Sequence, residues 1–194
     1  MKVRTLLLAI LCAVCASFGS HAQHVALKTN LIGDVALTPT LSAEVGVAPK
    51  WTLQLTGLIN AWDINSHKIK QWQLRPEARY WFCQRWAGHF VGAHLIGGQF
   101  NFGHIRNNIK FLGTDFSRLT DYRYQGWMGG AGLSYGYSWI LSRHWNLEAE
   151  IGLGWIHARF DEYQCADCGR KIRENLHHNY YGPTRAAINI VCTF

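Results

Sequence analysis

The sequence has no apolar run long enough to cross a membrane as a helix. The longest run, Thr5 to Ala16, is about a dozen residues, whereas a spanning helix needs roughly twenty. Proline is rare, with 4 residues in 194, and helical periodicity is weak throughout. Linkers, low-complexity tracts, phosphate-binding loops and nucleotide fingerprints are also missing. These absences exclude a helical membrane protein and a multidomain enzyme, and they favour one all-β domain.

The start of the chain has the three parts of a secretory signal peptide. Met1 to Arg4 is basic, the apolar run follows, and Ser20-His21-Ala22 is a small-x-small cleavage site. We therefore predict a signal peptide over residues 1–22 and a single domain over residues 23–194. Cleavage leaves 194 − 22 = 172 residues, and the net charge falls from +7 to +5 because Lys2 and Arg4 are lost.

Strict alternation of side-chain character marks the stretch Gln71 to Phe82. Side chains alternate across a strand, so every second residue shares a face. One face is apolar and the other is polar or charged. The apolar face holds Trp72, Leu74, Pro76, Ala78, Tyr80 and Phe82, and the polar face holds Gln71, Gln73, Arg75, Glu77, Arg79 and Trp81.

The alternating pattern recurs along the chain and predicts eight strands. They are His24–Leu31, Leu41–Val47, Trp51–Ala61, Gln71–Phe82, His89–Phe102, Tyr122–Leu141, Trp145–Trp155 and Tyr180–Phe194. Connections after the second, fourth and sixth strands are short. The others are longer and include the expected loops Gly33–Thr40, Asp63–Lys70, Gly103–Asp121 and Asp161–Asn179. An even strand number and alternating loop lengths are typical of an outer-membrane barrel.

We therefore predict an eight-stranded antiparallel transmembrane β-barrel with an up-and-down meander. Its N-terminus would lie in the periplasm and its long loops outside the cell. The alternative is a soluble, lipocalin-like barrel, which would place apolar residues inside. Two features argue against that alternative: aromatic residues gather at strand ends, as interfacial girdles do, and the strand Tyr122–Leu141 has one face of small residues.

The chain ends on Phe194, which closes an amphipathic strand. A terminal aromatic residue in this setting resembles the signal that the outer-membrane insertion machinery reads. The alternative is a chance aromatic end on a buried strand. We interpret Phe194 as an assembly signal and the insertion machinery as a partner.

Several charged residues fall on faces predicted to point into the barrel. They are Arg75, Glu77 and Arg79 on the fourth strand, Glu148 and Glu150 on the seventh, and Arg185 on the eighth. Isolated charges in a narrow interior are costly, whereas paired charges are tolerable. We predict that these three arginines and three glutamates form a network of ion pairs that fills the lumen.

Four segments carry a resemblance to a known family. They are HVALKTNLIGDVALTPTLSAEVG, QLRPEARYWFCQRWAGHFVGAHLIGGQFN, GAGLSYGYSWILSRHWNLEAEIGLGW and YYGPTRAAIN. Together they resemble the DUF3575-like proteins, an uncharacterised family of Bacteroidota proteins. The resemblance covers essentially the whole mature chain and implies an outer-membrane barrel, and it brings no catalytic residues. The architecture is also similar to the small OmpX-type and OmpA-type barrels.

Cys165 and Cys168 lie in the last expected surface loop, close to His177 and His178. Two thiolates and two imidazoles are a possible zinc set. A secreted compartment favours a disulfide instead, and two cysteines three positions apart can close a small loop. We predict a disulfide between Cys165 and Cys168, with no metal and no cofactor.

Three classes of function remain open. The first is a structural or interaction barrel that contacts lipopolysaccharide through basic loops, with surface adhesin or pilus components as further candidate partners. The second is a lipid-modifying enzyme built on His94 with Ser134 or Ser138, which no nucleophile elbow supports. The third is a pore, which eight strands disfavour because side chains fill so narrow a barrel. We adopt the first, a barrel that is not an enzyme and contacts no nucleic acid.

Overall fold

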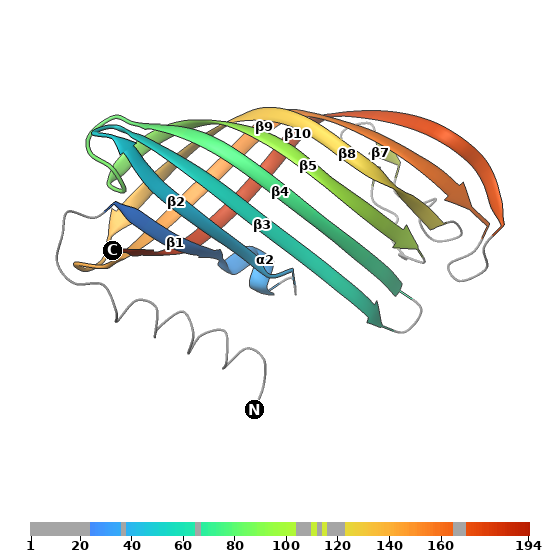
Figure 1. The fold of residues 1–194 in the computed structure, drawn as a ribbon, viewed down its shortest axis with the longest axis horizontal. Helices are drawn as coiled ribbons and strands as arrows, with labels where there is room; N and C mark the ends of the chain where they lie inside the picture. The colour runs from blue at the N-terminus through green and yellow to red at the C-terminus, as the bar shows by residue number, and fades with distance from the viewer. Residues whose placement is uncertain are drawn as a thin grey trace.

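A computed structural model describes residues 24–35, 38–64, 67–103, 110–111, 114–115, 123–164 and 170–194. The predicted signal peptide and the Cys165–Cys168 pair lie outside these residues. The main feature is a closed barrel of eight strands, with the neighbour order β1-β10-β9-β8-β5-β4-β3-β2 (Figure 1). All neighbours are antiparallel, which confirms the predicted up-and-down arrangement of eight strands.

The strands differ greatly in length. The barrel strands are β1 (Val25–Asn30), β2 (Thr40–Ala48), β3 (Trp51–Ile64), β4 (His67–Trp81), β5 (Gly88–Gly103), β8 (Arg123–Ile140), β9 (Trp145–Tyr163) and β10 (Lys171–Thr193). A short helix, α2 (Leu31–Val35), follows β1, and β6 (Lys110–Phe111) pairs with β7 (Thr114–Asp115) in a separate small sheet. Within the described residues, every helix is too short or too polar to cross a bilayer.

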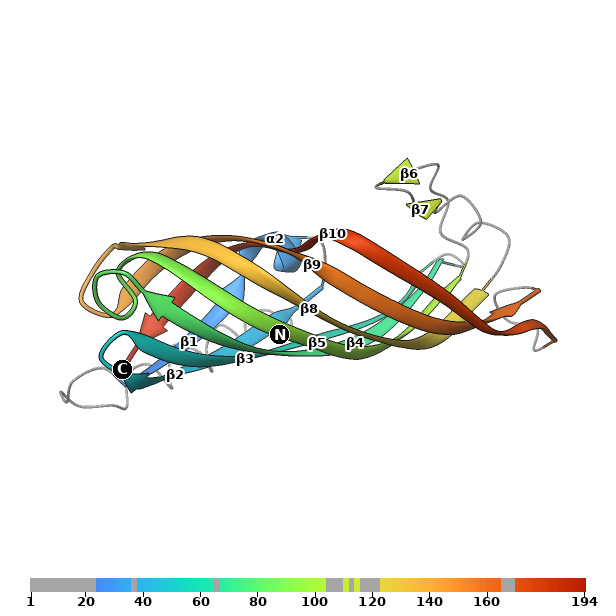
Figure 2. The same cartoon turned by 90° about the horizontal axis from the view of Figure 1, so that it is seen from above.

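The barrel closes where its first strand meets its last. Strand β1 pairs with β10 over five positions, from Ala26 opposite Thr193 to Asn30 opposite Asn189. Every other pairing in the barrel joins strands that follow one another in the meander. Because β1 has 6 residues and β10 has 23, the wall is low at the closure and high beyond it (Figures 1 and 2).

Two of the expected loops are largely strand. The segment 63–70 was expected to be a loop, but β3 and β4 stay paired up to Ile64 opposite His67, and only residues 65–66 lie between them. The segment 161–179 is likewise mostly strand, since β9 continues to Tyr163 and β10 starts at Lys171. Backbone hydrogen bonds need no apolar side chain, so polar residues extend these strands past the end of the alternating pattern.

A bulge interrupts β10 and changes which residues point inward. The register with β9 shifts between Pro183 and Arg185, and the extra residue leaves both Thr184 and Arg185 buried. A β-bulge re-aims the side chains that follow it. On β10, the even-numbered residues therefore face inward before the bulge and the odd-numbered residues face inward after it. A strict alternation of faces along the sequence does not predict this change.

The side-chain distribution is inverted relative to a soluble barrel. On β4, Trp72 and Leu74 point outward and are 44% and 47% exposed, whereas Glu77 and Arg79 point inward and are 3% and 0% exposed. The same contrast recurs around the ring, with polar side chains such as Thr52, Gln54, Glu148 and Asn189 buried. The face assignment made from the sequence alternation therefore holds in the structure.

An apolar cluster closes the end of the barrel that carries the short turns. It consists of Ala26, Trp81, Trp86, Phe90 and Val191. Trp86 lies in the turn between β4 and β5 with a φ of 58°, a left-handed conformation that is uncommon outside glycine. Its backbone carbonyl accepts hydrogen bonds from Ser138 Oγ at 3.0 Å and Asn146 Nδ2 at 2.7 Å. These bonds hold the turn under the barrel.

Candidate functional site

A cluster of ion pairs fills the middle of the barrel, above the apolar cluster, and Arg79 is its centre. Its guanidinium contacts all four carboxylates of the cluster. Arg79 Nη1 lies 3.1 Å from Glu148 Oε1 and 3.3 Å from Glu44 Oε2. Arg79 Nη2 lies 2.7 Å from Glu150 Oε2 and 3.2 Å from Glu77 Oε2. The guanidinium also stacks 4.5 Å above the Phe90 ring, which joins this layer to the apolar cluster below.

Two further cations, from the neighbouring strands β1 and β10, complete the pairing. Lys28 Nζ on β1 bonds to Glu44 and lies 2.6 Å from Glu148 Oε2. Arg185 on β10 places Nη1 2.8 Å from Glu77 Oε2 and Nε 2.8 Å from Glu150 Oε2. The cluster therefore ties β1, β2, β4, β9 and β10 together through the interior.

Neutral groups satisfy part of the remaining hydrogen-bonding capacity. Asn189 Nδ2 donates to Glu148 Oε1 at 2.9 Å, and Ser134 Oγ donates to Glu77 Oε1. The contacting cluster holds three cations and four glutamates, and Arg75, higher on the same inner face of β4, brings the formal charges to four of each sign. A buried cluster is tolerable when its charges are paired and hydrogen-bonded in this way.

The structure brings five of the six sequence-predicted lumen residues into direct contact. These are Glu77, Arg79, Glu148, Glu150 and Arg185. Arg75 faces the same interior but lies two inward positions higher on β4, about 13 Å along the strand. Its Nη2 donates to Gln73 Oε1 at 3.3 Å. Within the described residues, the cations that contact Glu148 are Lys28 and Arg79.

Sequence reasoning missed two members of the cluster, Lys28 and Glu44. Both are fully buried, at 1% and 0% exposure. Each already lay on the polar side of an alternating strand, so period-two alternation was the signal that could have found them. Charge balance alone did not require them, because three arginines and three glutamates already cancel.

Glycine residues on the inner face make room for the cluster. A Cβ placed on Gly92 would overlap Glu77 Oε1 and Ser134 Oγ, and a Cβ on Gly132 would lie 2.6 Å from His94 Nε2. Glycine in a strand often marks such close approach. The glycine-rich inner face of β8 therefore admits the side chains that fill the barrel.

The histidine considered for catalysis is part of this packing. His94 is 2% exposed, and its Nε2 lies 2.9 Å from Thr184 Oγ1. Ser134 donates to Glu77 and Ser138 donates to the Trp86 carbonyl. Within the described part of the chain, neither serine is hydrogen-bonded to His94, so the arrangement lacks the nucleophile–base contact that a triad requires.

The terminal residue is fixed at the barrel closure. The Phe194 N–H donates to the Val25 carbonyl at 2.9 Å, and the Phe194 carbonyl accepts the His24 N–H at 2.9 Å. Both main-chain groups of Phe194 are therefore occupied by the start of the chain. The predicted Cys165–Cys168 disulfide lies outside the described residues. Groups of three or more potential metal ligands are absent from the described part of the chain.

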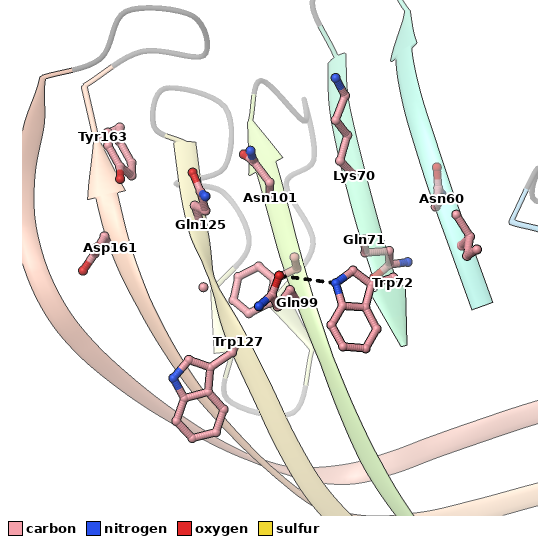
Figure 3. A pocket seen from close by; sticks show the side chains of 13 residues that line it. Asn60, Lys70, Gln71, Trp72, Gln99, Asn101, Gln125, Trp127, Asp161 and Tyr163 are labelled. Atoms are coloured by element: carbon pink, nitrogen blue, oxygen red, sulfur yellow. Dashed lines mark hydrogen bonds between the residues drawn. The ribbon is translucent and has the colours of Figure 1, made fainter. Parts of the chain in front are cut away.

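A hollow of about 550 Å³ lies on the outer wall where β3, β4, β5, β8 and β9 rise above the short strands. Trp72 on β4 and Trp127 on β8 lie on either side of Gln99 on β5, and Trp72 Nε1 donates to Gln99 Oε1 at 3.3 Å (Figure 3). Asn101 and Gln125 project from the next row of the sheet (Figure 3). The hollow thus combines two indole rings with several amides.

Comparison with family models gives one match, described as a protein of unknown function (DUF3575), over residues 6–194. Searches of curated proteins and of solved structures give no match.

Proposed function

The chain belongs to the DUF3575 family, and we propose that its barrel spans the outer membrane with a closed interior and serves as an interaction platform at the cell surface. The observation that carries this proposal is the inverted distribution of side chains. Large apolar residues cover the outside, including Leu133 at 70% exposure and Leu153 at 60%, while charged residues fill the inside. Lipid is the surrounding that makes this distribution favourable.

The height of the apolar wall fits a bilayer. On β9 the outward face runs from Trp145 to Trp155 through Leu147, Ala149, Ile151 and Leu153. Ten residues at about 3.3 Å each and a tilt of about 40° span about 25 Å, the height of a typical apolar band.

Aromatic residues gather at both borders of this band. Trp51 and Tyr80 pack with ring centroids 5.2 Å apart at the short-turn end, and Tyr137 and Trp139 pack at 4.8 Å. Trp72, Trp127 and Trp155 lie toward the opposite end. Tryptophan and tyrosine favour the membrane–water interface because their rings are amphipathic. Two aromatic borders therefore support a transmembrane placement.

The filled interior argues against a diffusion pore. The apolar cluster closes the short-turn end, and the ion-pair cluster occupies the middle, where Arg79 and Glu148 are 0% exposed. An ion crossing the barrel would have to break several buried charge pairs. We therefore assign the barrel no conducting role.

The strands continue past the upper aromatic border as a polar extension. Its residues include Arg159, Asp161, Lys171 and Glu174, and Lys171 Nζ lies 3.0 Å from Asp161 Oδ2. Charged residues at the ends of strands are well solvated and can contact polar partners. This extension would contact lipopolysaccharide and, in the wider proposal, surface adhesin or pilus components.

Membrane fractionation combined with gel migration tests the proposal. The mature protein should fractionate with the outer membrane and migrate differently in unheated and heated samples. Reconstituted in planar bilayers, it should give no steady conductance. Recovery as a soluble periplasmic protein would overturn the membrane placement, and stable channel openings would overturn the closed interior.

A further inference from the structure

The outer wall changes character at one row of residues. Across the paired strands, Ile59, Trp72, Gln99, Trp127 and Arg159 lie side by side, in register. Below this row the outward residues on β4, β5 and β8 are Leu74, Gly97 and Gly129. Above it the outward residues are Lys70, Asn101, Gln125 and Asp161. The row therefore marks the border between the apolar wall and the polar extension.

The hollow of about 550 Å³ lies at this border and has two distinct walls. Its lower wall is formed by the indoles of Trp72 and Trp127, which are 44% and 47% exposed. One strand, β5, lies between them, so their Cα atoms are two strand spacings, or about 10 Å, apart. Gln99 lies between the rings and accepts the Trp72 N–H with its oxygen, and its amide nitrogen is a donor.

The upper wall supplies hydrogen-bonding groups of both kinds. Asn101 and Gln125 carry amides, which donate and accept, and Tyr163 adds a hydroxyl. Lys70 and Asp161 contribute one charge of each sign, so the hollow has no excess positive charge to select a bare phosphate. Asp161 is held in place, because Oδ1 accepts the Asn175 N–H at 3.0 Å and Oδ2 lies 3.0 Å from Lys171 Nζ.

Sugar rings are the ligands that such a combination of groups suits. A pyranose ring has C–H groups on its faces, which pack on an indole, and hydroxyls on its rim, which need mixed donors and acceptors. The two indoles project from backbone positions about 10 Å apart, a spacing comparable to the length of two linked sugar rings. An apolar lining with a few convergent polar groups is also the usual form of a small-molecule site.

The wall just below the hollow has space for an apolar chain. Gly97 on β5 pairs with Gly129 on β8, and both face outward. A Cβ on Gly97 would meet no atom within 4 Å, so the surface here is recessed beneath Gln99. A ligand with a saccharide head and an acyl tail would place the head among the amides and the tail over these glycines.

We propose that this hollow binds the saccharide head of an outer-leaflet glycolipid, with Trp72 and Trp127 stacking on its sugar rings and Gln99, Asn101 and Gln125 bonding its hydroxyls. The inference rests on the proposed membrane placement, because the outer leaflet supplies the ligand only to a barrel that spans the membrane. It adds a defined site and a ligand class to that placement.

Binding of rough-type lipopolysaccharide to the purified, folded mature chain in detergent micelles tests the site. Native mass spectrometry would count the lipid molecules retained, and a titration would give the affinity. Trp127→Leu and Gln99→Ala should each weaken binding by about tenfold or more. Trp139→Leu is the matched control, because Trp139 is 45% exposed and lies at the opposite border. This control should change the affinity less than twofold.

Competition identifies the part of the ligand that is recognised. Core oligosaccharide without its lipid should displace the labelled lipopolysaccharide, whereas phosphatidylglycerol should not. Equal weakening by Trp139→Leu, or displacement by phosphatidylglycerol alone, would overturn the proposal. Heat-modifiable migration of each variant reports folding separately. If the unaltered chain and all variants migrate as folded proteins but none binds lipopolysaccharide, the glycolipid site alone is refuted. If the chain stays soluble without micelles, the membrane placement is refuted.

Discussion

Lys28 Nζ and Glu148 Oε2 lie 2.6 Å apart across the interior, although the two residues are 120 positions apart in the chain. Lys28 belongs to β1 and Glu148 to β9, so the contact passes beneath β10, the strand that separates them in the ring. Because β1 has only five paired positions with β10, this ion pair adds a side-chain connection where the backbone ladder is short. We infer that the cluster stabilises the closure as well as filling the interior.

Double-mutant analysis of this pair measures that contribution. Lys28→Met and Glu148→Gln should each destabilise the barrel, on the order of 3–5 kcal/mol, because each removes one of the two charge partners of a buried group. The double variant should lose at least about 1 kcal/mol less than the sum of the two. Urea unfolding in lipid vesicles, followed by tryptophan fluorescence, gives all four values. Strict additivity would show that the pair does not interact energetically.

Removal of Arg79 should have the largest effect of any single change in the cluster. Arg79→Met leaves four buried carboxylates without their common cation, and we expect a loss of at least about 3–5 kcal/mol. The control is Arg159→Met, since Arg159 is exposed and its side chain donates to Asn175 Oδ1 at 2.9 Å on the surface. That change should stay within about 0.5 kcal/mol. Similar midpoints for both variants in urea would contradict the assigned role of Arg79.

Two glycines on β5 provide a matched test of interior packing. Gly92→Ala would push a methyl group onto Glu77, whose carboxylate is held by Arg79 and Arg185 and has little freedom to move. Overpacking of this kind typically costs about 1–3 kcal/mol. Gly97→Ala faces open space and should be nearly neutral. The measurement is the unfolding midpoint of each variant. Equal midpoints would mean that the side chains around Gly92 move to accommodate the added methyl group.

The variant Phe194→Ala tests the assembly role of Phe194 separately from its structural role. This variant keeps the main-chain bonds to His24 and Val25 and removes only the ring. We expect slower appearance of the folded, heat-modifiable form in cells, with the unfolding midpoint of the purified protein little changed. Phe82→Ala is a control with an aromatic ring at the same end, exposed by 49%. Normal assembly kinetics for Phe194→Ala would remove its proposed role as a signal.

Alternation was sufficient to predict the ring of strands and the two faces of most of them. Each strand that crosses the apolar wall must keep one face apolar, so the period of two is strict there, as in β4 and β9. The pattern stops where the wall becomes polar on both faces, which is why the segments 63–70 and 161–179 were expected to be loops. Strand pairing continues there through backbone hydrogen bonds, which produce no alternation of apolar and polar residues in the sequence.

The partners within the cluster were harder to predict than its position. Facing inward is a property of one strand, but contact across the interior depends on the stagger of all eight strands. Arg75 and Arg79 share a face and differ only in height, and the stagger decides which of them meets Glu148. The bulge at Pro183 adds a second uncertainty, because it changes the phase of β10 without an apolar signal of its own.

The main-chain bonds of Phe194 to His24 and Val25 have a consequence for the order of events in assembly. A strand edge accommodates one neighbour at a time, so the last residue pairs either with a receptor strand or with β1. Recognition of the terminus and completion of the ring are then mutually exclusive states of the same hydrogen-bonding groups. If Phe194 is the assembly signal that we propose, closure of the ring would occupy the groups that a receptor strand reads, and the finished barrel would leave that receptor without a separate release step.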